Sequence, residues 1–348
     1  MATIREISKK ANVSIATVSK VLNGKSGVNE DTRNAILSIA NELNYHPNLN
    51  ARNLKTGRTK TLGIITEDLT VFNTPEIVDG IAVACNEHGY HYILENLRFN
   101  KQYHNVSVTP SELKELIDQA IHDLLSRQID GIIYIGCHSH VIPPLSAQTG
   151  IKFVCAYCLS ANPDIPSVTY DDAKAAYDVT ELLISDGNTK IGIISGPIDS
   201  IHTANRTKGY QEALFHHGIS FNPALAYVGD WSRASGYEHA KKLIDAGVTA
   251  IFAYNDLMAL GVLDYCNEHG IQVGSDLKVM GFDNRDISNV CRPTLSTVAL
   301  PLFEIGQNAA KLMFDQISEA KENLPNEVQL ECNIIEREST DFKIPFHS

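Results

Sequence analysis

The feature that most constrains this chain is a regular alternation, from Leu62 onward, of short apolar runs with amphipathic helical stretches. Such an alternation indicates strand–helix–strand units and parallel sheets, so we expect an α/β fold. The predicted strands are 62–66, 90–94, 131–135, 152–156, 190–195, 250–254 and 278–282. The predicted helices are 75–88, 112–126, 172–186, 203–217, 235–246, 256–269 and 302–320. Two doubly wound lobes fit this number of strands better than one very wide sheet.

The first sixty residues show helical patterns only. The sequence TIRE, beginning at Thr3, has the spacing of a capping box and predicts a helix over 4–11. Asn12 suits a left-handed turn, and Ser14 can cap a second helix over 15–22. So short a connection between two helices is typical of a helix-turn-helix.

A third amphipathic helix over 30–43 is expected to close a three-helix core. Its predicted core residues are Ile36, Leu37, Ile39, Ala40 and Leu43. In the second helix Val18, Val21 and Leu22 share one face. The opposite face presents Ile15, Ala16, Ser19 and Lys20. A small helical bundle without a ligand would show the same helix pattern.

The distribution of charge distinguishes a DNA-binding domain from a helical bundle without a ligand. The 348 residues carry a net charge of −12, which by itself argues against nucleic-acid binding. Residues 1–60, however, contain ten basic and four acidic side chains and carry +6, so the rest of the chain carries −18. A basic N-terminal part with short exposed side chains favours DNA as its ligand.

The sequences VSIATVSKVLNG (13–24) and NYHPNLNARNLKTGRT (44–59) closely resemble the lactose-repressor (LacI/GalR) family of bacterial transcription regulators, and the resemblance covers nearly the whole chain. It implies a helix-turn-helix DNA-binding domain over 1–46, a hinge helix or linker over 47–60, and an effector-binding and dimerisation domain over 61–340. The last part would be a two-lobed sensor that resembles periplasmic sugar-binding proteins.

The resemblance also implies roles for individual residues in DNA binding. Ile15, Ala16 and Lys20 would face base edges in the major groove, and Lys20 could donate to guanine. Many family members have an arginine at this position, and a lysine lacks the pair of fixed N–H donors that arginine offers to a base. The residues that would hold phosphates are Ser14, Thr17, Asn23 and Arg33. In the hinge, Leu54 would be the apolar wedge in the minor groove and Ala51 the small residue where two hinges meet; a flexible basic linker is the alternative.

The sensor lobes are placed by the same resemblance. The N-lobe is expected at about 61–160 and 298–326, and the C-lobe at about 165–294 and 328–340. The chain would cross between lobes near 158–167, 292–300 and 325–329.

Ligands in such folds bind at the carboxyl ends of the strands. Independently of the resemblance, this rule selects 66–72, 95–96, 137–140, Tyr157, 195–199, 255–256 and 283–284. The set is rich in carboxylates and amides, which suits a polyhydroxylated ligand.

The resemblance selects six of the sensor's residues for effector binding. Arg206, Asn255 and Asp283 match its pocket arginine, amide and carboxylate. Trp231, the single tryptophan, falls at its aromatic position, although a lone Trp is more often a core residue. Arg206 and Asp283 could form a plain ion pair, but holding adjacent hydroxyls accounts better for both. The remaining two residues are Phe72 and Tyr157; many relatives have a ligand-binding aspartate at the latter position.

A metal site is a weaker hypothesis. Cys137, His138 and His140 follow one predicted strand, and Cys155 and Cys158 lie at the end of the next, so together they could hold zinc. A single C-x-x-C is a weak signal, and buried thiols and surface histidines are ordinary. We therefore predict no metal and no cofactor.

These observations rank three classes of function. The leading hypothesis is a repressor of a carbohydrate-utilisation operon, a homodimer whose affinity for a near-palindromic operator is controlled by a small sugar-like effector. The alternative is a catabolite-control regulator governed by a protein partner. The chain has no Walker loop, G-x-S-x-G elbow or G-x-G-x-x-G opening a helix, so an enzyme is not expected. The N-terminus MATIREISKK lacks a signal-peptide core and no apolar run approaches ~18 residues, which predicts a cytoplasmic protein with no membrane partner.

Overall fold

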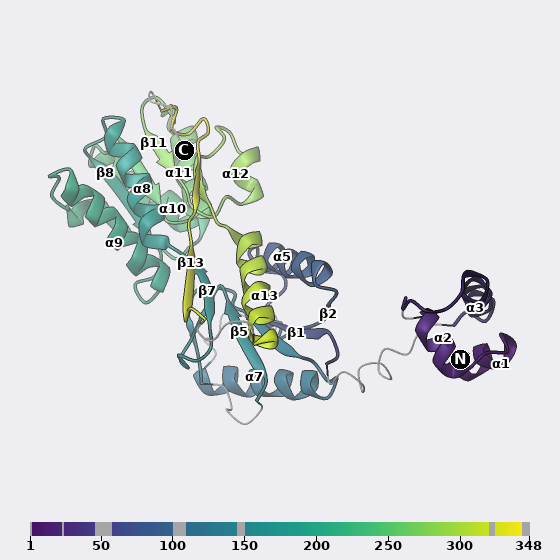
Figure 1. Cartoon of the computed structure of the whole chain (residues 1–348). Helices are drawn as coiled ribbons and strands as arrows, with labels where there is room; N and C mark the ends of the chain where they lie inside the picture. Colours follow the sequence, from purple (N-terminus) through teal and green to yellow (C-terminus); the bar gives the residue numbers. More distant parts are fainter. Residues whose placement is uncertain are drawn as a thin grey trace. The chain divides into compact units, whose positions relative to one another are not determined.

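The computed structural model describes residues 2–22, 24–45, 58–99, 109–144, 150–319 and 324–342. The chain forms two compact units, Met1–Thr59 and Lys60–Ser348. Both are drawn in Figure 1. Within the described ranges no helix is long and apolar enough to cross a membrane.

The first unit contains the helices α1 (Ile4–Lys10), α2 (Ile15–Leu22) and α3 (Glu30–Glu42). The predicted capping box is present at the start of α1, where Thr3 and Glu6 each bond to the other's backbone N–H. The turn between α1 and α2 has its left-handed residue at the predicted asparagine. The three predicted helices are therefore confirmed, with ends that differ by one residue or less.

The core of the first unit is small. It consists of Ile7, Val18, Val21, Ile36 and Ala40. The prediction that Leu37 joins this core is wrong, since its side chain is 41% exposed. The reason is helical geometry: each residue turns about 100° from the one before it, so Leu37 leaves the stripe on which Ile36 and Ala40 lie.

The first lobe of the second unit is built on a six-stranded sheet in which every neighbouring pair of strands is parallel. Its strand order is β13-β7-β5-β3-β1-β2. The strands are β1 (Thr61–Thr66), β2 (His91–Asn96), β3 (Gly131–Ile135), β5 (Lys152–Ala156), β7 (Ser167–Tyr170) and β13 (Glu327–Leu330). Beside this sheet, β4 (Val141–Ile142) pairs with β6 (Leu159–Ser160).

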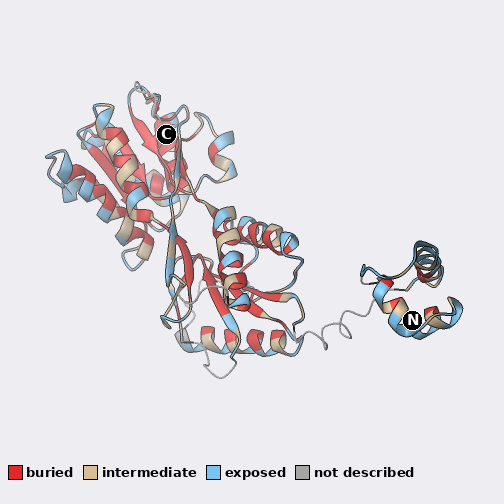
Figure 2. Cartoon of the chain, in the orientation of Figure 1, coloured by how far each residue is buried: buried red, intermediate tan, exposed pale blue. Residues whose placement is uncertain are grey.

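Helices cover both faces of this sheet, as Figures 1 and 2 show. The helices are α5 (Thr74–Glu87) and α13 (Leu302–Ser318), which pack together on one face, and α7 (Pro110–Leu125) on the other. Alternate residues of β1 serve the two faces, since Ile64 and Ile65 belong to different hydrophobic clusters. Contact between α5 and α13 requires glycine, because a Cβ on Gly80 would lie 2.1 Å from the carbonyl oxygen of Phe303.

The second lobe has a parallel four-stranded sheet with the order β11-β10-β8-β9. The strands are β8 (Ile191–Ser195), β9 (Ala226–Val228), β10 (Ala250–Ala253) and β11 (Lys278–Met280). The helices are α8 (Asp172–Ser185), α9 (Ile201–His216), α10 (Arg233–Asp245), α11 (Asp256–Glu268) and α12 (Asp286–Val290), with a short 3-10 helix at Pro223–Leu225. Helices α8 and α9 pack as one pair and α10 and α11 as another. An antiparallel pair, β12 (Thr297–Ala299) and β14 (Asn333–Ile335), completes the lobe.

The predicted fold class is confirmed, because both lobes have parallel sheets and the seven predicted strands and helices of this unit all form. Two predicted crossings are wrong. Strands β7 and β13 pair with each other in the first sheet, so the chain crosses after 170 and after 330 rather than near 158–167 and 325–329. The third crossing lies between β12 and α13, at the end of the predicted 292–300 segment.

Candidate functional site

The outer face of α2 is the first candidate surface. Val18 and Val21 point into the core of the first unit, which leaves Ser14, Ile15, Ala16 and Lys20 exposed and Thr17 half-exposed. Ser14 caps the helix, because its hydroxyl accepts a hydrogen bond of 3.0 Å from the backbone N–H of Thr17. The side chain of Ile15 is 45% exposed, so it is accessible to a ligand of this surface.

A second basic residue lies close to the turn after α2. Arg33 of α3 donates from Nη2 to the carbonyl oxygen of Lys25 at 2.7 Å, so its guanidinium is held toward this turn with other N–H groups left to donate. The other residues predicted to contact DNA, Asn23, Ala51 and Leu54, lie outside the described residues.

Arg206 of α9 is the centre of the second candidate site, in the second unit. Its side chain is 2% exposed, and its Nε donates to the carboxylate of Asp172 at 2.6 Å. It also donates to the carbonyl oxygen of Tyr254 and to the hydroxyl of Tyr170, the latter at 3.0 Å. The guanidinium carbon lies 3.5 Å from the ring centroid of Phe282, a close cation–π contact. These contacts use part of the guanidinium's five N–H groups.

Asp172 is fully enclosed at the start of α8 and binds a second partner, His202 of α9, at 2.7 Å. Burial disfavours its charged form, but Arg206 and His202 outweigh burial and hold the pKa of the carboxyl below its usual range. Nε2 of His202 accepts a hydrogen bond of 3.1 Å from the backbone N–H of Ser139. Because Ser139 belongs to the first lobe and His202 to the second, this bond joins the two lobes.

Asp283 lies beyond β11, in a left-handed backbone conformation with φ of 110°. Burial raises the pKa of its carboxyl well above the usual range, and nearby Arg206 opposes that rise. Its half-buried side chain accepts no hydrogen bond from the parts of the chain that the structure describes. Arg206 and Asp283 are therefore electrostatic neighbours but not a closed ion pair.

Trp231 lies on the strand-end loop of the second lobe. Its indole covers Gly196, where a Cβ would fall 1.9 Å from the ring, and the guanidinium of Arg206 is 6.0 Å from the ring centroid. Asn255 holds this loop in place through both ends of its side-chain amide. Its Nδ2 donates to the carbonyl oxygen of Trp231 at 3.0 Å, and its Oδ1 accepts from the backbone N–H of Met258 at 2.8 Å.

The two predicted residues of the first lobe face the same region. Tyr157 is almost fully buried, with its ring 5.5 Å from that of Tyr170, and burial together with the charge of Asp283 raises the pKa of its hydroxyl. Phe72 is half-buried, and its ring centroid lies 4.9 Å from the guanidinium carbon of Arg285 in the second lobe. The predicted effector residues of both lobes thus lie near the contacts between the two lobes, in a region that we call the cleft because of its place between the lobes.

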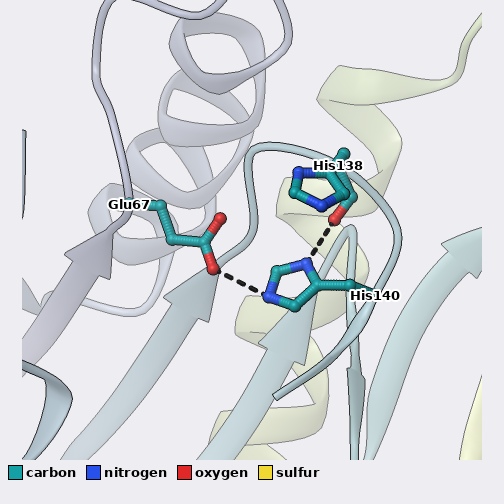
Figure 3. Close-up of side chains that lie close together, drawn as sticks. All are labelled: Glu67, His138 and His140. Atoms are coloured by element: carbon teal, nitrogen blue, oxygen red, sulfur yellow. Dashed lines mark hydrogen bonds and ion pairs between the residues drawn. The ribbon is translucent and has the colours of Figure 1, made fainter. Parts of the chain in front are cut away.

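A third group of polar side chains occupies the first-lobe side of that cleft. Glu67 directly follows β1, and His138 and His140 come from the loop after β3 (Figure 3). Burial disfavours the charged forms of Glu67 and His140, but their mutual attraction at 2.9 Å lowers the pKa of the carboxyl to about 2 and raises that of the imidazole to about 9. Cys155 and Cys158, which were considered with these histidines, are fully buried and are not part of this group.

The sequence prediction of single residues missed several members of the cleft. These are Asp172, Tyr170, His202, Thr203 and Glu67. Glu67 falls inside the strand-end segment 66–72, so the rule had found its position but not its importance. The others sit on β7, which was not predicted, or in the first turns of α8 and α9, where a helix pattern does not distinguish a cap from a site residue. Thr203 has a buried hydroxyl without a hydrogen-bond partner in the described ranges.

Comparisons with known proteins match both units of the chain. Residues 3–48 match the family model of bacterial regulatory proteins, lacI family, and residues 180–340 match a periplasmic binding protein-like domain. Catabolite control protein A from Priestia megaterium is 34% identical over 345 residues, which cover 97% of this chain and 99% of that protein. The chain belongs to the LacI family. It is a DNA-binding transcription regulator, and the first unit is its DNA-binding domain.

Other relatives and solved structures of the LacI family also match over nearly the full length. The HTH-type transcriptional repressor CytR from Escherichia coli K12 is 31% identical over 342 residues, covering 97% of this chain and 96% of that protein. The structure of a transcriptional regulator CelR–cellobiose complex has a TM-score of 0.65 at 27% identity, covering 97% of this chain and 100% of that chain. A lac repressor dimer bound to operator and an anti-inducer has the same fold, with a TM-score of 0.75 at 24% identity and coverage of 97% and 99%.

Proposed function

We propose that this LacI-family regulator is a homodimeric repressor of a carbohydrate-utilisation operon, released from a near-palindromic operator by a small sugar-like effector. The observation that carries the proposal is the proximity of Arg206 and Asp283 beside the contacts between the two lobes. Together they offer a guanidinium with unused N–H groups beside a carboxylate that accepts no hydrogen bond from the described residues. A donor and an acceptor side by side match the adjacent hydroxyls of a sugar.

The walls of the cleft suit the same ligand class. Trp231 provides a flat apolar surface, and Phe72 and Tyr157 provide further aromatic rings from the opposite lobe. The similar CelR structure is a complex with cellobiose, which supports a sugar but does not identify the one bound here. Asn255 is better assigned to positioning Trp231, because both ends of its amide are already bonded.

For the DNA-binding domain, we propose that the exposed face of α2 reads base edges through Ile15, Ala16 and Lys20. Ser14, Thr17, Asn23 and Arg33 would bind phosphates, and Ala51 and Leu54 would act in the hinge. The exposure of the α2 residues supports the first assignment. Leu54→Ala should weaken operator binding far more than binding to a random duplex, since only the specific complex bends DNA around the wedge. Equal losses on both duplexes would contradict the hinge assignment.

The effector proposal is tested by a thermal-shift screen of mono- and oligosaccharides, followed by titration with Trp231 fluorescence as the signal. A sugar that binds should also release the protein from operator DNA in an anisotropy assay. Asp283→Asn should abolish the sugar response and leave operator affinity unchanged. Asp164→Asn, at an exposed aspartate in a first-lobe loop, is the matched control and should behave as the wild type. A normal sugar response in Asp283→Asn would refute the assignment of the cleft.

The second candidate is control by a protein partner, and the similarity to catabolite control protein A favours it. Calorimetry separates the two. Binding of a phosphocarrier protein without a response to any sugar would replace the main proposal, whereas heat from a sugar that is lost in Asp283→Asn would uphold it.

A further inference from the structure

The group formed by Glu67, His138 and His140 has no part in the proposed function so far. The three residues each place one ligand atom within 4.8 Å of the other two. Figure 3 shows the carboxylate reaching the imidazole of His140 while the ring of His138 lies beside it. The ring centroids of the two histidines are 4.6 Å apart. Two imidazoles and one carboxylate are a donor set that first-row transition metals accept, and one that zinc uses with a fourth position left open.

The spacing of the donors agrees with a shared ion. Zinc binds nitrogen and oxygen at about 2.0–2.2 Å in tetrahedral geometry, which puts neighbouring ligand atoms about 3.3 Å apart. Oε1 of Glu67 and Nε2 of His140 are 2.9 Å apart, so they need to separate by only a few tenths of an ångström. His138 is exposed, and its Nδ1 lies 3.2 Å from Sγ of Cys137, so binding an ion with the other two residues through this nitrogen would replace that contact.

The surroundings already orient two of the three donors. Nδ1 of His140 donates to the carbonyl oxygen of His138 at 2.8 Å, which directs Nε2 toward Glu67. The proton that Nε2 shares with Glu67 in the ion pair must leave when a metal ion binds, so binding releases a proton. The carboxylate of Glu67, which is 1% exposed, is held by the hydroxyl of Tyr134 at 2.6 Å and the backbone N–H of Cys137 at 2.7 Å. A ligand histidine bonded to a backbone carbonyl, and a ligand carboxylate bonded to fixed donors, are the supports that metal sites use.

In contrast to the sequence-based prediction of no metal, we propose that Glu67, His138 and His140 bind a divalent transition-metal ion of the Zn²⁺ class on the first-lobe side of the cleft. Imidazole nitrogens select such an ion over Mg²⁺ and Ca²⁺, which take oxygen ligands. Ser139 lies between the two histidines and donates its backbone N–H to His202 of the second lobe. An ion held at this loop would therefore fix a segment that contacts the other lobe.

The test uses the full-length protein after treatment with a chelator. Zn²⁺ is titrated in competition with a chromophoric chelator, and Co²⁺ is titrated by its visible absorption, which reports the coordination geometry. His138→Gln removes one donor at an exposed position, and His140→Gln removes a second. His122→Gln, at an exposed histidine of α7, is the matched control. Because thiols also bind zinc, the double variant Cys155→Ser/Cys158→Ser is measured in parallel.

We expect one ion per chain in the wild type, the His122→Gln control and the double cysteine variant. Both cleft-histidine variants should bind at least about tenfold more weakly. Zn²⁺ should raise the melting temperature of the wild type by mass action and leave that of His138→Gln unchanged. Undiminished affinity in both histidine variants would place the ion elsewhere and overturn the proposal, as would a wild type that binds neither metal. The sugar titration of the preceding section is independent of this result.

Discussion

Removing the guanidinium of Arg206 should destabilise the sensor unit, because it would leave the buried carboxylate of Asp172 with only His202 beside it. Breaking a buried ion pair by deleting one partner costs about 3–5 kcal/mol. For a unit of this size, 1 kcal/mol corresponds to about 2 °C, so Arg206→Met should melt about 6–10 °C below the wild type. Replacing both partners, in Arg206→Met/Asp172→Asn, removes the stranded charge and should restore most of the loss.

The pH dependence of the free energy of unfolding provides a second test of this prediction. In the wild type the pKa of Asp172 is lowered, so its contribution is present at neutral pH and is lost only as pH falls through that low value. Without Arg206 the effect of burial is no longer outweighed, so the pKa of the Asp172 carboxyl rises and the folded protein takes up a proton there at a pH where the carboxyl of the unfolded chain is still ionised. Stability of Arg206→Met should therefore rise relative to the wild type as pH falls from 8 to 5, while the double variant shows no such trend.

Thermal and urea unfolding followed by Trp231 fluorescence measure this unit alone, since the chain has no other tryptophan. A loss below about 1 kcal/mol in Arg206→Met, the size of an exposed pair, would show that Asp172 is solvated. A double variant no more stable than the single one would equally refute the reasoning. The double variant is also useful in the sugar-binding test. If it is stable but does not respond to sugar, the missing response cannot be attributed to unfolding.

Three further predictions concern other parts of the molecule. Gly196→Ala should displace the indole of Trp231, which a Cβ would meet at 1.9 Å, and the fluorescence emission spectrum should shift; an unchanged spectrum would contradict this packing. Lys20→Ala should cost about 1–3 kcal/mol on operator DNA and less on random DNA in an anisotropy titration, and equal losses would argue for a phosphate contact instead. Ile36→Ala, at a fully buried core position, should cost about 2–5 kcal/mol and unfold the DNA-binding domain, abolishing operator binding while the Trp231 melting curve stays as in the wild type.

The sequence predicted most of the fold because its strongest signals are local. A capping box, a left-handed asparagine and a four-residue apolar period define the first unit, and apolar runs of five residues define the central strands. Among the described residues, the strands that were not predicted all have two to four residues: β4, β6, β7, β9, β12, β13 and β14. Length alone does not explain this, because β10 and β11 are as short and were predicted; β7 and β13, in addition, pair with a partner distant in the chain. Strand β13 pairs with β7 across more than 150 residues, and that pairing sets the lobe boundary. No local periodicity contains this information.

The candidate site, like the fold, was predictable from the sequence only in part. The rule that ligands bind at strand ends selected the loop of Asp283, the family resemblance selected Trp231, and the structure places both near Arg206. The roles of individual groups were not predictable, because they depend on partners from other elements. Asn255 was expected to contact the ligand, yet its amide is bonded at both ends. Asp172 and His202 become members of the cleft only through contacts between α8 and α9.

The same polar groups that join the two lobes are those that would contact an effector, and this overlap supplies a physical route for signalling. Arg206 of the second lobe donates to Tyr170 of the first at 3.0 Å, and His202 accepts from Ser139 at 3.1 Å. A hydrogen bond that involves a charged group contributes about 1.5–3 kcal/mol, which is the size of a typical allosteric coupling energy, about 1–3 kcal/mol. A ligand that binds the unused N–H groups of Arg206 and also displaces Tyr170 from its N–H would therefore need to exchange only a single contact of this kind to favour one arrangement of the lobes over another. Because the coupling is reciprocal, any change that strengthens the hydrogen bond between Arg206 and Tyr170 must lower the affinity for a ligand that competes for the same N–H.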